Sequence, residues 1–157
     1  MAHLVNYMKL EDEIKQTKPF KSEIQKLVLN ISFTGSWLNS LSAEMLKPFD
    51  VSAPQYNVLR ILRGKYPESY CNQEITGRMI DKNSNATRIV DKLIVKGLAK
   101  SSENPSDRRA VEIVITEKGI DLLKQIDING FGNYLDLLKI NEENAKQMND
   151  WLDEMRG

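Results

Sequence analysis

The chain of 157 residues contains very little cysteine and histidine. Cys71 is its single cysteine, so no disulfide can form within one subunit, which agrees with a reducing compartment. His3 is its single histidine, and a zinc site within one subunit needs more Cys or His than these two. Without a histidine in the body of the chain there is no Ser-His or Cys-His pair, and no glycine-rich phosphate loop follows a strand. The sequence therefore favours a protein that is not an enzyme and needs no metal or cofactor.

The sequence also lacks any long hydrophobic run. No apolar stretch approaches the roughly 18 to 20 residues that a helix needs to span a bilayer. Residues 1–15 alternate between polar and apolar side chains and lack the basic start and apolar run of a signal peptide. The expected compartment is therefore the cytoplasm.

The formal net charge at pH 7 is zero, which by itself argues against a nucleic-acid partner. The charges are nevertheless segregated along the sequence. From Arg78 to Arg109 there are eight basic and four acidic residues, whereas from Glu117 to Gly157 there are five basic and nine acidic ones. Because a local basic patch matters more for phosphate binding than the total charge, the middle of the chain is the candidate nucleic-acid-binding region.

Apolar residues at helical spacing predict a long helix that begins near Ser22 and ends near Pro48. Ser52, followed three residues later by Gln55, is typical of a capping box and predicts the start of a second helix. The long helix carries an apolar stripe that a small domain cannot fully cover. A second copy of the chain would cover it across a dimer axis.

Four further elements are expected around the middle of the chain. A short helix is predicted over 72–79, with Cys71 in the loop before it as a semi-buried small hydrophobe rather than a redox sensor. Thr116 caps a helix that extends to about residue 139, with glycines that mark a bend or a close helix contact. Asn141 caps a last helix with an apolar stripe. The expected fold is mainly α with a small β-hairpin.

The helix expected from Asn83 or Ser84 to Lys96 has an apolar inner face and a polar, basic outer face. Gly97 followed by the apolar Leu98 predicts that this helix ends in a Schellman motif. One interpretation is a solvated surface helix, which would be favoured for a helix taken alone. The other is a recognition helix in the major groove of DNA, favoured here by the short helix before it and the hairpin after it. The side chains with that role would be Ser84, Asn85, Thr87, Arg88 and Lys92, and the ammonium groups of Lys92 and Lys96 would lie near the DNA backbone.

Two strand-like runs follow, at 98–102 and 110–115, and the turn residues between them predict a hairpin. The hairpin has a basic tip that contains Asp107, Arg108 and Arg109. The tip is either an ordinary exposed charged turn or a wing whose arginine enters the narrow minor groove. Its place after the candidate recognition helix favours the wing.

Five stretches together resemble the MarR family of regulators in order and spacing. The resemblance covers about half of the chain, and its most specific part is the wing sequence with the run that follows it. The stretches are SAPQYNVL (52–59), SNATRIVDKL (84–93), KGL (96–98), NPSDRRA (104–110) and ITEKG (115–119).

The resemblance implies a winged helix-turn-helix that binds a pseudo-palindromic operator in duplex DNA as a homodimer, often released by a small-molecule effector. It implies one MarR-like domain over 1–157, with a DNA-binding lobe at 52–116 and dimerisation helices at 1–48 and 117–157. It also implies that Arg109 enters the minor groove with Asp107 in support. The expected function is a ligand-responsive repressor.

Two alternatives remain open at the level of the sequence. Phe33, Trp37 and Tyr56 would line an effector cleft, although aromatic residues at helical spacing are more often part of a core. The winged helix would also suit a protein-interaction module that does not contact DNA. The basic outer stripe and the two arginines of the tip argue against that module.

Overall fold

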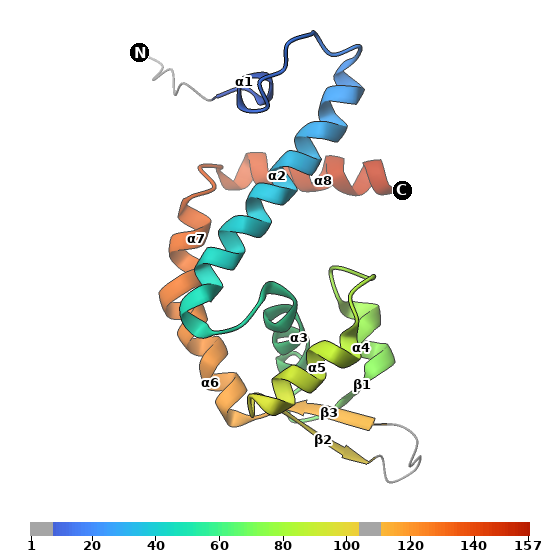
Figure 1. The fold of residues 1–157 in the computed structure, drawn as a ribbon, viewed down its shortest axis with the longest axis vertical. Helices are drawn as coiled ribbons and strands as arrows, with labels where there is room; N and C mark the ends of the chain where they lie inside the picture. Colours follow the sequence, from blue (N-terminus) through green and yellow to red (C-terminus); the bar gives the residue numbers. More distant parts are fainter. Residues whose placement is uncertain (1–7, 104–110) are drawn as a thin grey trace. The chain divides into compact units, whose positions relative to one another are not determined.

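The computed structural model describes residues 8–103 and 111–157 (Figure 1). The chain divides into two compact units, residues 1–41 and residues 42–157. The fold is mainly helical with one antiparallel sheet of three strands, which confirms the expected class and adds a strand to the expected hairpin. In the part of the chain that is described, no helix is long and apolar enough to cross a membrane.

The N-terminal unit holds a one-turn helix, α1 (Leu10–Glu13), and most of the long helix α2 (Glu23–Leu46), which confirms the first predicted helix. Lys26 Nζ lies 2.6 Å from Glu11 Oε1. This hydrogen-bonded pair lowers the pKa of Glu11 and raises the pKa of Lys26. Only Leu46 of α2 is buried. Its exposed large apolar residues are Ile24, Leu27, Val28, Leu29, Phe33 and Trp37.

After α2 the chain turns sharply. The 3-10 turn η1 (Lys47–Phe49) contains Pro48, which has no N–H to continue the helix. Asp50 then adopts the left-handed region, with φ 52° and ψ 39°, which short polar side chains tolerate better than most others. This turn leads the chain from α2 into the C-terminal unit's first complete helix.

That helix, α3 (Ala53–Arg63), begins with the predicted capping box. The Ser52 hydroxyl accepts the Gln55 N–H at 3.4 Å, and Gln55 Oε1 accepts the Ser52 N–H at 3.0 Å. These two bonds satisfy N–H groups at a helix start that have no partner within the helix. The start of α3 is therefore fixed by local chemistry.

The short helix α4 (Asn72–Arg78) is confirmed, but the loop predicted before it is wrong. Cys71 belongs to a strand, β1 (Tyr70–Cys71), which pairs antiparallel with β3 (Val111–Ile115). Tyr70 lies opposite Ile113, and Cys71 lies opposite Glu112. A two-residue strand is too short for alternation to reveal it, because the pattern needs at least four residues. Cys71 is half-buried, as expected.

Helix α5 (Ala86–Val95) ends in the predicted Schellman motif. Gly97 has φ 70°, a conformation that glycine adopts without a steric penalty. Its N–H donates to the Ile94 carbonyl at 2.8 Å, and the Leu98 N–H donates to the Leu93 carbonyl at 2.9 Å. The chain leaves α5 directly into β2 (Ala99–Glu103).

The sheet has the order β1-β3-β2, with β2 and β3 antiparallel in a register from Ala99 opposite Ile115 to Glu103 opposite Val111. Helix α3 packs against α5, α6 (Glu117–Ile126) and β3 around one apolar core. The fully buried large side chains of this core are Leu46, Val58, Leu59, Leu62, Ile75, Met79, Leu93, Ile113, Ile115, Leu123 and Ile126.

Thr116 caps α6 through its hydroxyl, which accepts the Gly119 N–H at 3.2 Å. The helix then continues as a π-helical segment, η2 (Asp127–Phe131), and as α7 (Gly132–Asp136), slightly short of the predicted end. The glycines predicted to mark a bend lie in and just after the π segment. Such a segment inserts an extra residue into the helical turn.

The last helix, α8 (Glu142–Arg156), begins at Asn141, whose side chain accepts the Asn144 N–H at 2.8 Å, as predicted. No residue of α8 is buried. Its exposed large apolar residues are Met148, Trp151 and Met155.

Candidate nucleic-acid interface

The N-terminus of α5 is held by side chains of the turn before it. Asn85 Oδ1 accepts the Arg88 N–H at 3.0 Å, so Asn85 caps the helix and the predicted start at residue 83 or 84 is two to three residues early. Asp81 accepts the Asn83 N–H at 2.9 Å and the Ser84 hydroxyl at 2.7 Å. The Ser84 hydroxyl is the main reason that the pKa of Asp81 is lowered.

These contacts reduce the hydrogen-bonding atoms that two of the predicted site residues, Ser84 and Asn85, leave available to a ligand. The Ser84 hydroxyl donates its proton to Asp81, and the Asn85 oxygen is used by the helix cap. The Ser84 oxygen lone pairs and the Asn85 amide N–H groups remain for a ligand. Thr87 is exposed on the first turn of α5.

The outer face of α5 presents two cations at helical spacing. Arg88 and Lys92 are both exposed, while Ala86, Val90 and Leu93 on the opposite side are buried in the core. Within residues 8–103 and 111–157, neither the Arg88 guanidinium nor the Lys92 ammonium has a hydrogen-bond or ion-pair partner. The helix is thus anchored on one side and free to bind anions on the other.

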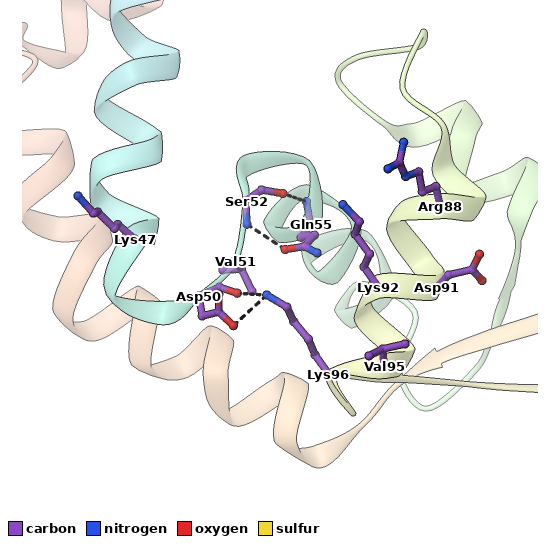
Figure 2. A pocket seen from close by; sticks show the side chains of 10 residues that line it. All are labelled: Lys47, Asp50, Val51, Ser52, Gln55, Arg88, Asp91, Lys92, Val95 and Lys96. Carbon is purple, nitrogen blue, oxygen red and sulfur yellow. Dashed lines mark hydrogen bonds and ion pairs between the residues drawn. The ribbon is translucent and has the colours of Figure 1, made fainter.

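A hollow lies between this face and the start of α3 (Figure 2). In this view Lys92 extends from α5 toward the Ser52–Gln55 cap of α3, and Lys96 extends toward Asp50. The partial positive charge of the α3 N-terminus adds to that of the lysines. Four basic side chains and two acidic ones line the hollow, with apolar and polar residues between them: Lys47, Asp50, Val51, Ser52, Gln55, Arg88, Asp91, Lys92, Val95 and Lys96.

Lys47 is a member of this hollow that sequence reasoning missed. It lies in η1, before α3, and lines the edge of the hollow, while its ammonium points away from the other lining side chains in Figure 2. A lysine next to a proline at the end of a long helix carries no signal that would have assigned it to a binding face.

The predicted wing is described only in part. Strands β2 and β3 and their pairing are described, but Asp107, Arg108 and Arg109 lie outside the described residues. Their roles therefore stay predictions that follow from the sequence.

The residues predicted for an effector cleft belong to different units. Phe33 and Trp37 line a hollow in the N-terminal unit together with α1 residues such as Leu10. Tyr56 belongs to the C-terminal unit, where its hydroxyl accepts a hydrogen bond from Arg60 Nη1 at 2.9 Å. Arg60 also lies over the Tyr56 ring, 5.7 Å from its centroid. The effector cleft stays a prediction.

Comparison with known proteins places this geometry in a family context. Residues 51–111, from the turn before α3 to the start of β3, match the MarR family. The transcriptional repressor MprA of Escherichia coli strain K12 is 29% identical over 83 residues, which are 53% of this chain and 47% of that protein. The chain therefore spans about half the length of that relative.

The match to a second relative is longer. The multiple antibiotic resistance protein MarR of Escherichia coli strain K12 is 29% identical over 117 residues, which are 71% of this chain and 76% of that protein. A crystal structure of a mutant of that protein, complexed with operator DNA, superposes with a TM-score of 0.76 at 23% identity, covering 88% of this chain and 99% of that one. This likeness shows that the fold is shared.

Proposed function

We propose that the chain is a transcriptional regulator of the MarR family that binds duplex DNA as a homodimer, most simply as a repressor. This proposal is supported by the match of residues 51–111 to that family and by the 29% identity to the multiple antibiotic resistance protein MarR over 117 residues. The observation that carries the proposal is the outer face of α5. Arg88 and Lys92 are exposed there without protein partners in the described residues, beside a hollow at the start of α3. Such a face suits a negatively charged duplex and needs no catalytic group.

In this proposal α5 enters the major groove. Thr87 and Arg88 lie on its first turn, where a recognition helix contacts base edges, and an arginine there reaches guanine with two hydrogen bonds. Ser84 and Asn85 contact DNA through the atoms that the cap and Asp81 leave open. Lys92 lies farther along the helix and neutralises a phosphate, which releases counterions.

The wing extends the contact to the minor groove. Arg109 enters the groove, Asp107 supports it, and Arg108 lies beside it, as the resemblance to the family implies. The described strands β2 and β3 provide the rigid base from which such a tip projects. A narrow minor groove attracts arginine because its negative potential is strong.

The dimer would be formed by the helices outside the lobe, within residues 1–48 and 117–157. Helices α2 and α8 both carry exposed large apolar residues, among them Leu27, Val28 and Trp151. Exposed apolar groups of this size gain about 25 cal/mol per Å² when a second copy covers them. Two recognition helices related by the dimer axis would enter grooves about 34 to 36 Å apart. The hollow beside Phe33 and Trp37 is where an effector would bind.

Selection of bound fragments from genomic DNA tests the function and supplies the operator. We expect one enriched, pseudo-palindromic site, bound with an affinity that falls steeply as salt rises. The control is a duplex of the same composition with the half-sites scrambled. Failure to bind any duplex at low salt would refute the proposal and would favour the protein-interaction module instead.

A further inference from the structure

Lys96 differs from the other cations of the α5 face. Its Nζ hydrogen-bonds the Asp50 carbonyl and lies 3.1 Å from Asp50 Oδ2. Lys92, one turn earlier on the same helix, has no such partner among the residues described. Lys96 is also less exposed, with 31% of its side chain accessible to solvent. Its ammonium is therefore committed within the protein.

The end of α5 is anchored on a second side as well. Lys118 Nζ donates to the Lys96 carbonyl at 2.7 Å, and the Thr116 hydroxyl donates to the Gly97 carbonyl at 2.7 Å. The first bond satisfies the carbonyl of the residue that caps the end of α5, and the second satisfies the carbonyl of the glycine that follows it. The end of α5 is thus fixed between the start of α6 and the turn at Asp50.

Asp50 lies at the junction between α2 and α3. Asp50 is the left-handed residue at which the chain passes from α2 and η1 into α3. Both of the groups that hold Lys96, a backbone carbonyl and a carboxylate, belong to this residue. Any displacement of the turn is therefore transmitted to the end of α5 through one side chain.

We propose that Lys96 is a positioning residue, which ties the end of the recognition helix to the α2–α3 junction and does not bind a phosphate. This inference rests on the proposed function only for its consequence in DNA binding. The contact between Lys96 and Asp50 sets the orientation of α5 and links that orientation to the position of the end of α2. A ligand or partner that moved the end of α2 would change DNA binding through Lys96.

The salt dependence of operator binding separates a tie from a phosphate ligand. Each neutralised phosphate contributes about 0.9 to the slope of log K against log salt. We expect Lys96→Met to weaken binding by about twofold to fivefold, the range of an exposed ion pair, without changing the slope. The matched control, Lys92→Met on the same face, should lower the slope by about 0.9. A loss of slope in Lys96→Met would overturn the proposal.

Asp50 supplies the second half of the test. Asparagine tolerates the left-handed conformation, so Asp50→Asn removes the charge and keeps the turn. We expect it to weaken operator binding less than Lys96→Met does, because the Asp50 backbone carbonyl still accepts a hydrogen bond from Lys96, and to add little to Lys96→Met in the double variant. If Lys96 bound phosphate, removing a nearby acid would instead tighten binding. Tighter binding by Asp50→Asn would therefore contradict the tie.

Hydrogen exchange of the free protein decides the matter without DNA. Lys96→Met should raise amide exchange at the last turn of α5 and at residues 50–52, whereas Lys92→Met should not. Unchanged exchange in Lys96→Met would refute the tie. If the wild-type protein bound no DNA, the proposed function would fail, but this measurement would still report on the tie.

Discussion

Helices α5 and α2 are both amphipathic, but they dispose of their apolar faces differently. Helix α5 buries Ala86, Val90 and Leu93 within its own lobe, whereas only Leu46 is buried along the 24 residues of α2. The C-terminal unit around α5 therefore has its own apolar core, while α2 leaves large apolar side chains exposed. We propose that a second copy of the chain covers this exposed apolar surface of α2.

The strongest test of this contrast places a charge on the apolar face of α2. Val28 is 58% exposed, so Val28→Glu should leave the lobe folded but bury a carboxylate in the proposed dimer interface. We expect a monomer in sedimentation analysis and a loss of operator affinity of about a hundredfold or more, since a stranded buried charge costs several kcal/mol. Asn30→Glu, at an exposed polar position of α2, is the control. A dimeric Val28→Glu protein would contradict the assignment of this face.

Substitution of a glycine by alanine should have opposite effects on the free energy of unfolding in α6 and in α2. A Cβ at Gly119 in α6 would lie 2.3 Å from the Leu98 carbonyl oxygen and 2.7 Å from Ile115 Cγ1. Gly119→Ala should therefore lower the free energy of unfolding by about 3 kcal/mol, at the upper end of overpacking effects. A Cβ at Gly35 in α2 meets nothing within 4 Å among the described atoms. Gly35→Ala should therefore raise the free energy of unfolding by up to about 1 kcal/mol. Urea unfolding measures both.

The wing provides a change that should affect binding but not assembly. Arg109→Ala should weaken operator binding by about tenfold to a hundredfold, as for a residue that makes a good groove contact, and leave the dimer intact. Lys100→Ala, at an exposed position of β2, is the control and should have a small effect. Normal binding by Arg109→Ala in a gel-shift assay would rule out the role given to this residue.

The smallest expected effect concerns the turn before α5. The pKa of Asp81 is lowered, chiefly by the Ser84 hydroxyl and then by the Asn83 N–H. The charged carboxylate therefore contributes stability above its unfolded pKa of about 3.9, and this contribution is lost as pH falls through the lower folded value. Asp81→Asn should be slightly less stable than wild type at pH 7, and the difference should shrink toward pH 3. Asp91→Asn is the control in thermal unfolding, and a difference independent of pH would contradict the ionic origin.

The sequence predicts best where structure depends on near neighbours. The Ser52–Gln55 capping box, the Gly97 helix end and the Asn141 cap are all confirmed, because each is a local motif with a strict requirement for one side chain or for glycine. The basic outer face of α5 is confirmed for the same reason, since helical spacing alone places Arg88 beside Lys92.

The parts that sequence reasoning missed depend on contacts across the fold. Strand β1 exists only because β3 pairs with it, and its two residues carry no periodic signal. The Ser84 hydroxyl donates to Asp81 in the turn, so α5 begins after Ser84, later than the sequence predicts. The bond between Lys96 and Asp50 joins residues 46 positions apart, and nothing in the local sequence distinguishes Lys96 from Lys92.

The Schellman ending at Gly97 also bears on how much sequence one subunit can read. It closes α5 after 10 residues, a rod of about 15 Å. Stacked bases advance about 3.4 Å each, so such a rod lies alongside four or five steps of the duplex. In the proposed dimer, a recognition helix of this length would contact only a short base sequence in each half of the operator. Further sequence specificity would then come from the spacing between the two half-sites and from the deformability of the base pairs between them.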